Sequence, residues 1–380
     1  MAPTPTASCS STKMLRLLSF ITCVLLLCSC GNHTAGSGPQ GDTLALDHAS
    51  LLTMVEDGAS THVTVSDPWH AGKTLQRLTL GTAEGNGVLR PLRRVVVFTT
   101  SHCQLLEYLG LADRIVGVCD VQYMLIPDIQ QRVKTGAIAD CGDAMSPDVE
   151  KIVSLNPDAI ILSPFEGGSY GRLEKLGIPL IMAADYMETS ALGRAEWMRY
   201  YGRLFGEAAK SDSLFHVVDS TYGALKAYAA RLPKGRSILT ERKTGAVWYV
   251  PGGQSSMGVL LADANSPYAF ANDEHSGSLS LSFEQVLDKA GASDVWAFKF
   301  NGRRPMTRTD LLREYQGYKA LRAFQTGEIY ECNASLTPYF EEVSFRPDYL
   351  LREMILLAHP KAALGNLRYF TKIASTPLAQ

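Results

Sequence analysis

Residues 191–232 carry no strand signal, and they divide two segments in which short apolar strands alternate with helices. Aromatic and leucine residues recur at helical spacing up to Gly206, and 207–232 then carry an apolar stripe that favours one long helix. At about 1.5 Å per residue, this helix would be roughly 35–40 Å long, more than a small lobe needs. The pattern therefore predicts two lobes connected by a helix.

The segment before this helix contains apolar runs that are typical of strands buried on both faces of a sheet. The clearest is 94–98, and it is followed by the stretch 99–102, Thr-Thr-Ser-His, whose hydroxyls could cap the next helix. Strands that alternate with helices indicate a parallel sheet covered by helices. The predicted elements are strands at 94–98, 115–118, 159–162 and 178–182, and a helix at 149–155 entered through Pro147 in its first turn.

The segment after the helix repeats this alternation. Residues 146–161 and 280–297 share one frame, in which Ser, an apolar residue, Glu and an apolar pair precede a strand opened by Asp. We therefore predict an α/β protein of two βα lobes with central, mainly parallel sheets, joined by one long rigid helix, with a ligand cleft between the lobes. The predicted elements are strands at 237–240, 246–250 and 295–298, and helices at 254–263, 283–289 and 347–359.

The first 30 residues have the anatomy of a secretory signal, because a basic stretch precedes an apolar run that ends at Cys30. The run is too short for a membrane span, which needs about 20 apolar residues. Its end, Leu-Cys-Ser-Cys at 27–30, resembles the bacterial lipobox, which implies cleavage before Cys30 and lipidation of its thiol. We expect a lipoprotein signal peptide at 1–30, a flexible tether at 31–43 and a membrane anchor made by the lipid.

The remaining chain is long enough for two domains. We expect an N-terminal lobe at 44–206 with a strand-rich lead-in, the interdomain helix at 207–232 and a C-terminal lobe at 233–380. In the lead-in, alternation of apolar and polar residues predicts short strands at 62–66 and 75–80. The formal net charge of −2 offers no basic field for nucleic acid, so no nucleic-acid partner is expected.

Cysteine and histidine spacing gives no metal signature. The cysteines after Cys30 form no CxxC pair, and the histidines form no HxH or HExxH motif. Cys119 and Cys141 could be bridged in an oxidising compartment, but two buried free thiols fit equally well. We expect neither a resident metal nor a cofactor.

Loops at the carboxyl ends of parallel strands commonly gather ligand sites, and here they hold many aromatic residues. Aromatic side chains suit a flat or ring-rich ligand, although any single one could instead pack beneath its loop. His102 lies beside Ser101, a pair that could suggest nucleophilic catalysis, but Ser101 does not lie in a GxSxG elbow that would support it. We therefore expect His102 to be a residue at the start of a helix, and we expect no enzyme. The predicted ligand-binding residues are Ser101, His102, Tyr123, Tyr170, Tyr186, Trp248, Tyr249 and Tyr339.

A set of ordered motifs then identifies a resemblance. They are LGLADRIVGV at 109–118, VEKIVSLNPDAI at 149–160 and LEKLGIP at 173–179, with a looser match in SFEQVL at 282–287. With these motifs the chain resembles the periplasmic binding proteins of ABC importers for iron–siderophore, haem and cobalamin. The resemblance implies two lobes on a single rigid helix, a metal chelate as ligand, and an ABC permease and ATPase as partners. We expect a monomer.

The same resemblance implies docking on the permease through one acidic residue on each lobe. In the first lobe, Glu166 is the best match and Glu174 the second. In the second lobe the matching loop has Gln254 where an acid is expected, which leaves that contact unassigned.

The ligand itself does not follow from the resemblance. Siderophore-binding members use basic residues, haem-binding members a tyrosine and cobalamin-binding members aromatic walls; here aromatics are plentiful, while Arg242, Arg303 and Arg304 could contact an acidic chelate. Two alternatives stay open. One is a chelatase or corrinoid-processing enzyme on the same scaffold, and the other is a capture module for an outer-membrane receptor.

Overall fold

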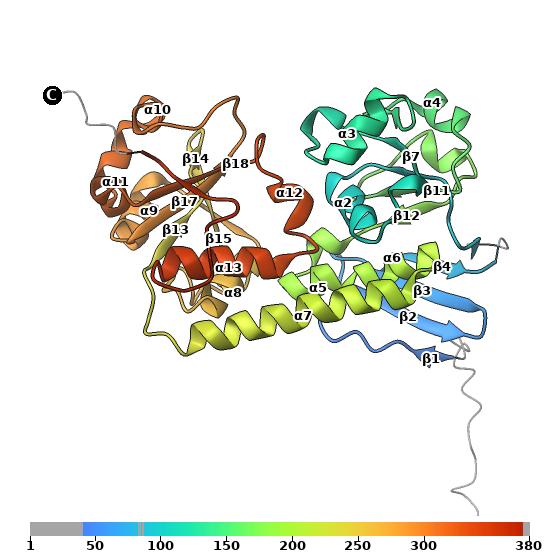
Figure 1. Cartoon of the computed structure of the whole chain (residues 1–380), viewed down its shortest axis with the longest axis horizontal. Coiled ribbons are helices and arrows are strands. Elements are labelled where there is room, and N and C mark those ends of the chain that lie inside the picture. The colour runs from blue at the N-terminus through green and yellow to red at the C-terminus, as the bar shows by residue number, and fades with distance from the viewer. Residues whose placement is uncertain (1–40, 83–84, 86, 375–380) are drawn as a thin grey trace, which may run out of the picture. The chain divides into compact units, whose positions relative to one another are not determined.

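The structure is a computed structural model that describes residues 41–82, 85 and 87–374 (Figure 1). The predicted signal peptide, its lipidation residue Cys30 and most of the predicted tether lie outside the described residues. The last residues of that tether form a strand, β1 (Asp42–Thr43), which pairs with the next strand of the chain.

The lead-in to the N-terminal lobe is a five-stranded sheet. Its strands in spatial order are β1, β2 (Leu52–Asp57), β3 (Ser60–Ser66), β4 (Thr74–Leu80) and β5 (Gly87–Val88). Both predicted strands are confirmed, in β3 and β4, and every second residue of β3 is buried, as a sheet with one covered face requires. The strand β2 was not predicted.

Two buried glutamates fasten this lead-in to the helices of the lobe. The Glu196 carboxylate accepts backbone N–H groups from residues 47–49 at 2.8–3.0 Å. The Glu188 carboxylate accepts those of Ser50 and Leu51, each at 2.9 Å. We call residues 47–51 the strap. Because a buried carboxylate needs donors, the strap and the two glutamates stabilise each other.

The central sheet of the N-terminal lobe is entirely parallel, as predicted. Its strands in spatial order are β12 (Leu180–Met182), β11 (Ala159–Leu162), β6 (Val95–Val97), β7 (Ile115–Val118) and β8 (Ala139–Asp140). Val95 and Val97 pack in one hydrophobic cluster and Val96 in another, so both faces of β6 are covered. The helices that follow the first strands are α2 (Thr100–Tyr108), α3 (Pro127–Lys134) and α4 (Val149–Ser154).

Two local predictions in this lobe were wrong. The hydroxyls expected from 99–102 do not cap α2, because the residue at its cap position is Thr99, whose hydroxyl makes no cap and instead lies 3.1 Å from Ser163 Oγ. Pro147 does not open α4, because it belongs to the short strand β10 (Ser146–Pro147). The cap of α4 is Asp148, whose carboxylate accepts the Lys151 N–H at 2.9 Å.

The stretch without strand signals forms three consecutive helices, α5 (Ala191–Glu196), α6 (Met198–Phe205) and α7 (Ala208–Ala230). Gly206 separates the last two, with a φ of 74° that a side chain would disfavour. The helix α7 is unbroken over 23 residues and contacts α6 at one end and α13 (Pro347–Ala358) of the other lobe. Figure 1 shows it running beneath both lobes.

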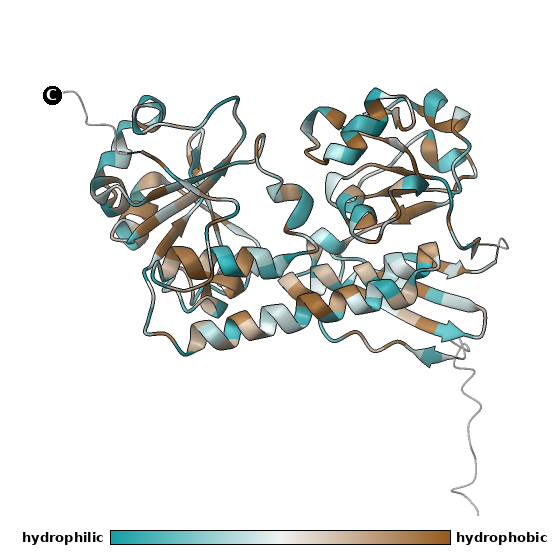
Figure 2. Ribbon diagram, in the orientation of Figure 1, coloured by the Kyte–Doolittle hydropathy of each residue, from teal (hydrophilic) through white to brown (hydrophobic). Residues whose placement is uncertain are grey.

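The C-terminal lobe has a four-stranded sheet in which three strands are parallel and the last is antiparallel. Its strands in spatial order are β13 (Ile238–Thr240), β17 (Val295–Phe300), β18 (Ile329–Asn333) and β19 (Thr371–Lys372). The predicted helices appear as α8 (Ser256–Asp263), α9 (Phe283–Ala290) and α13. Hydrophobic residues concentrate on the central strands and on α13 (Figure 2).

Part of this lobe departs from the predicted alternation. The strand at 246–250 is present as β15 (Val247–Pro251), but it lies in a separate antiparallel sheet between β14 (Lys243–Thr244) and β16 (Ser278–Leu281). Three short helices were not predicted, because their sequences are too short for a visible period. They are α10 (Arg308–Glu314), α11 (Arg322–Thr326) and α12 (Tyr339–Glu342).

Candidate ligand-binding site

The loops that follow the strands of the N-terminal sheet surround a cavity of about 380 Å³. Ser163, Phe165 and Tyr170 come from the loop after β11, and Thr99 comes from the end of β6. Met145 also lines this cavity, and its side chain is largely exposed. The parallel topology thus brings these loops together at one edge of the sheet, as expected from the sequence.

Two of the predicted tyrosines on these loops are held by their hydroxyl groups. Tyr170 donates to the carbonyl of Ser163 at 2.8 Å, and Tyr186 donates to that of Pro164 at 2.7 Å. Burial raises the pKa of Tyr170 to about 12, so its hydroxyl stays protonated as a donor. Both side chains are therefore anchored at the polar end and offer ring surface instead of a free hydroxyl.

A second cavity, of about 270 Å³, lies between the lobes. The N-terminal lobe contributes Ser101 and Arg194, and the C-terminal half of the chain contributes Met257, Tyr339 and Phe340. It therefore brings together two of the predicted residues, Ser101 and Tyr339, across the lobes. Both are more than nine-tenths buried, whereas Phe340 is 47% exposed.

His102 is buried and does not line either cavity. Its Nε2 lies 2.8 Å from Asp185 Oδ1, and Arg194 Nε donates to the other carboxylate oxygen at 3.4 Å. Burial on its own would raise the pKa of Asp185, but His102 and then Arg194 hold that pKa below its usual range. The structure thus places His102 in a buried hydrogen bond with Asp185, away from both cavities.

Trp248 and Tyr339, both in the C-terminal half, occupy different surroundings. Trp248 is fully buried among Phe283, Trp296 and Tyr318, and its Nε1 donates to the carbonyl of Thr240 at 3.0 Å. It lies in the core and lines no cavity described above. Tyr339, in contrast, lines the interlobe cavity, and burial raises its pKa to about 12.

The other two predicted tyrosines are on the surface. Tyr123 is 70% exposed in the loop after β7, and Tyr249 is 48% exposed on β15. Neither lines the cavities of 380 or 270 Å³. Their part in ligand binding remains a prediction.

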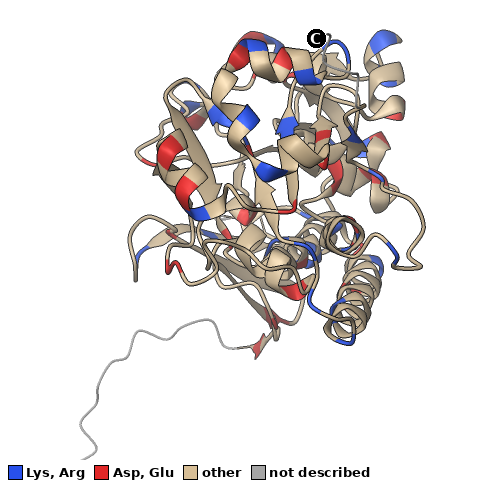
Figure 3. Cartoon of the chain, turned by 90° about the vertical axis from the view of Figure 1, so that its left-hand side faces the viewer, with Lys and Arg blue, Asp and Glu red and all other residues tan. Residues whose placement is uncertain are grey.

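Most of the arginines considered for an acidic chelate are already paired. Arg242 Nη1 contacts both carboxylate oxygens of Glu314, at 2.7 and 2.8 Å. Arg304 makes two hydrogen bonds to Asp310, while Arg303 is exposed. Acidic and basic residues are interspersed over the face drawn in Figure 3. An anionic ligand would therefore have to displace Glu314 or Asp310 to reach Arg242 or Arg304.

The predicted docking residue Glu166 is exposed in the loop after β11. The second choice, Glu174, instead accepts the Tyr170 N–H at 2.7 Å and the Ser169 hydroxyl at 3.2 Å. In the other lobe, Gln254 N–H donates to the carbonyl of His275 at 3.2 Å. This contact brings the exposed Glu274 next to the loop that lacks the expected acid.

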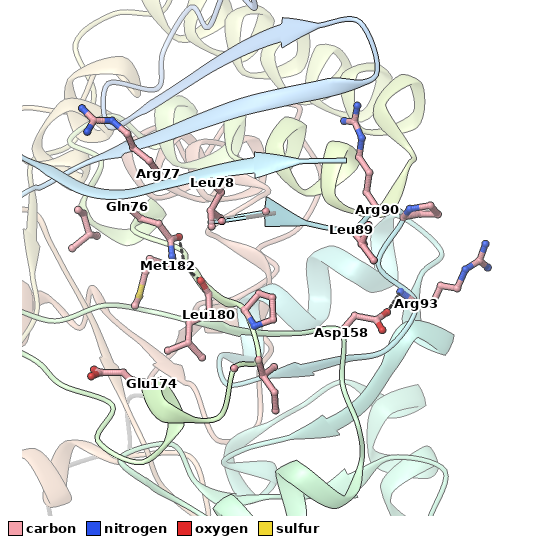
Figure 4. Close-up of a pocket in the computed structure, with 17 residues that line it drawn as sticks. Gln76, Arg77, Leu78, Leu89, Arg90, Arg93, Asp158, Glu174, Leu180 and Met182 are labelled. Atoms are coloured by element: carbon pink, nitrogen blue, oxygen red, sulfur yellow. Dashed lines mark hydrogen bonds between the residues drawn. The ribbon is translucent and has the colours of Figure 1, made fainter. Parts of the chain in front are cut away.

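A larger cavity of about 1210 Å³ lies elsewhere, between the lead-in sheet and the edge strand β12 (Figure 4). Gln76 spans it, accepting the Met182 N–H at 2.9 Å and donating to the Leu180 carbonyl at 2.7 Å. None of the predicted ligand-binding residues lines this cavity. Its size alone does not make it the ligand site.

Cys103, Cys119, Cys141 and Cys332 are free and buried, so the bridge left open for Cys119 and Cys141 is not formed. Among the described residues, no group of His, Cys, Asp and Glu side chains could hold a metal ion. In the same part of the chain, no helix combines the length and the apolar character of a membrane span.

Residues 95–336 match the periplasmic binding protein family. The chain belongs to this family. Among relatives of this periplasmic binding protein, an uncharacterised lipoprotein of Methanocaldococcus jannaschii is 23% identical over 291 residues, covering 74% of this chain and 68% of the relative. The petrobactin-binding protein YclQ of Bacillus subtilis is 27% identical over 200 residues, covering 51% of this chain and 61% of the relative.

Solved structures support the same fold. A periplasmic haem-binding protein from Pseudomonas aeruginosa superposes with a TM-score of 0.57 at 16% identity, covering 75% of this chain and 99% of that one. The neighbours include siderophore-, haem- and vitamin B12-binding proteins, which share this fold. The match of residues 95–336 confirms the family expected from the sequence motifs. The lead-in sheet lies outside the residues that match the family.

Phe340 belongs to the loop at 332–345 that the sequence already offers as a cleft candidate, whereas Arg194 and Met257 are among the residues of the interlobe cavity that sequence reasoning missed in this binding protein. Arg194 had a usable signal, because Ser190 caps α5 by accepting the Gly193 N–H at 3.1 Å and so marks a helix start beside a strand-end loop. Met257 had none, since a single apolar residue on a short helix gives no sign of which way it faces.

Proposed function

We propose that this periplasmic binding protein is anchored by a lipid on Cys30 and delivers a metal chelate of the iron–siderophore, haem or cobalamin type to an ABC importer. The observation that carries the proposal is the aromatic edge of the N-terminal sheet, whose loops form one cavity and adjoin a second one between the lobes. The likeness to petrobactin- and haem-binding proteins supports it.

The surroundings favour a ring-rich chelate over a strongly anionic one. Phe165 and Phe340 are exposed by 41% and 47%, and Tyr186 by 36%, so each can contribute ring surface to a ligand. The ion pairs of Arg242 and Arg304 would have to be broken before those side chains could bind a carboxylate or catecholate. Breaking such pairs would offset much of the gain from binding a charged ligand.

Native mass spectrometry of the full chain with haem, cobalamin, a ferric hydroxamate and a ferric catecholate tests the proposal. We expect one of the first three to be retained in a one-to-one complex and the catecholate to bind more weakly. A folded protein that retains none of the four would refute the proposed ligand class. Conversion of a retained chelate into a product would favour the enzyme alternative.

The lipid anchor is tested separately. Cys30→Ser in the full chain should leave the protein unprocessed or release it from the membrane fraction, whereas Cys332→Ser, a buried thiol in the C-terminal lobe, should not. Equal membrane fractionation of the Cys30 variant and the parent protein would argue against the anchor.

For permease docking we propose Glu166 on one lobe and Glu274 on the other. Charge reversal at either position should weaken ligand-stimulated ATP hydrolysis by the reconstituted importer, because each acid would meet a basic residue of the permease. Glu150→Lys is the matched control, since Glu150 is also exposed but lies on α4. If all three variants stimulate equally, the two acids are not docking residues.

A further inference from the structure

The short helix α12 lies between the lobes, although its sequence belongs to the C-terminal half of the chain (Figure 1). It packs against α2 of the N-terminal lobe. The chain reaches it from β18 and leaves it for α13, both of which belong to the C-terminal lobe. This segment therefore makes a contact between the lobes that is additional to α7.

One side of the segment is bound to the N-terminal lobe. Glu341 is 1% exposed, and its Oε1 accepts the Leu125 N–H at 2.9 Å and the Thr100 hydroxyl at 3.2 Å. Phe345 is fully buried in the hydrophobic cluster of that lobe. Its ring lies 6.1 Å from that of His102 and 6.2 Å from that of Tyr201, centroid to centroid.

The other side is bound to the C-terminal lobe. Glu342 accepts hydrogen bonds from Arg368 Nε at 2.7 Å and from the Tyr369 hydroxyl at 2.8 Å. The ring of Tyr339 packs edge-to-face against that of Tyr369, with centroids 5.4 Å apart. Adjacent glutamates thus bind opposite lobes.

Helical geometry explains this division. Residues three or four apart lie on the same side of a helix, whereas neighbours are turned by roughly 100°. Tyr339 and Glu342 share one side, and Glu341 and Phe345 share another. Backbone hydrogen bonds from Val343 to Tyr339 and from Arg346 to Glu342 continue the helical turn past the end of α12.

We propose that residues 339–345 form an interlobe latch that fixes the spacing of the lobes, with Glu341 as its positioning residue. By holding Leu125, Glu341 also restrains the loop that carries the exposed Tyr123, while Phe340 of the latch lines the interlobe cavity. The latch sets how far apart the N-terminal loops and Phe340 stand, whichever ligand binds. It can therefore be tested without ligand.

The hydrogen bonds of Glu341 with Leu125 and Thr100 are buried, so losing them should cost more than losing exposed ones. Burial raises the pKa of Glu341, and the Leu125 N–H and Thr100 hydroxyl oppose that rise. Removing the carboxyl group deprives both donors of their acceptor, and the empty space weakens the contact between α12 and α2.

The test uses the full chain without ligand. Spin labels attached through p-acetylphenylalanine at Val153 on α4 and Asp288 on α9 leave the native cysteines untouched, and pulsed electron resonance then reports the distance between the lobes. Glu341→Ala should broaden the distance distribution. Hydrogen exchange at the Leu125 amide should accelerate by about tenfold or more, because this amide loses its acceptor.

The matched control is Glu188→Ala, which removes another buried carboxylate that accepts backbone N–H groups but acts within the N-terminal lobe. It should speed exchange at Ser50 and Leu51 and leave the interlobe distance unchanged. Glu341→Gln should restore much of the parent distribution, because its amide oxygen still accepts the Leu125 N–H; it also serves if the alanine variant does not fold. A Glu341→Ala protein that folds and keeps the parent distance distribution would overturn the latch.

Discussion

Trp248 and Tyr249 are neighbours on β15 and face opposite sides of its sheet, so that one is fully buried and the other is 48% exposed. Trp248→Ala should therefore lower the free energy of unfolding by ~3–5 kcal/mol, because it empties a core position among three aromatic rings. Tyr249→Ala should change it by less than about 0.5 kcal/mol. Denaturant unfolding of both apo variants measures the difference, and equal losses would contradict the assignment of Trp248 to the core.

Tyr186 tests the aromatic edge of the N-terminal sheet. Its ring is partly exposed and its hydroxyl is held by the Pro164 carbonyl, so truncation should remove stacking surface from the ligand. Tyr186→Ala should weaken chelate binding by ~2 kcal/mol, roughly thirtyfold, and shift the apo melting temperature only slightly. Tyr186→Phe should keep most of the affinity. Strong apo destabilisation with unchanged affinity would assign Tyr186 to structure alone.

A substitution at Glu196 tests whether the strap holds the lead-in sheet on the N-terminal lobe. Glu196 is fully buried and accepts three backbone N–H groups, so Glu196→Ala leaves those donors without their acceptor. We expect a loss of at least ~3 kcal/mol in the free energy of unfolding and faster proteolysis within 47–66. Glu150→Ala on the surface should have little effect. A lead-in that stays protected in the Glu196 variant would show that the packing of the sheet suffices.

Asp185 predicts a pH dependence of stability. Because its folded pKa lies below the unfolded value, its contribution is fully present above about pH 4 and is lost as the pH falls through the folded pKa. Asp185→Asn should be less stable than the parent at neutral pH, and the difference should shrink on acidification. Melting temperatures of both proteins from pH 7 to pH 3 measure it. A constant difference over this range would show that the His102 pair does not control Asp185.

The sequence predicted the central sheets well because their strands are continuous apolar runs. The apolar runs at 94–98 and 159–162 favour buried strands, and both contain one. The predicted helix at 207–232 contains all of α7. The side chains that line the site were harder to predict. Alternation along a strand shows that Trp248 and Tyr249 point to opposite faces, but it does not show which of the two is buried in the core. Glu341 and Glu196 gave no signal, because a buried carboxylate and a solvated one look the same in a sequence.

The side chain of Gln76 bears on whether copies of this protein associate through a sheet edge at high concentration. The outer edge of β12 exposes backbone groups that could pair with a strand from another molecule. The Gln76 amide occupies one donor and one acceptor on that edge, as a strand of the same sheet would. We therefore expect this side chain to disfavour pairing between the edges of two molecules. Gln76→Ala should make the protein more prone to self-association at high concentration, which light scattering measures.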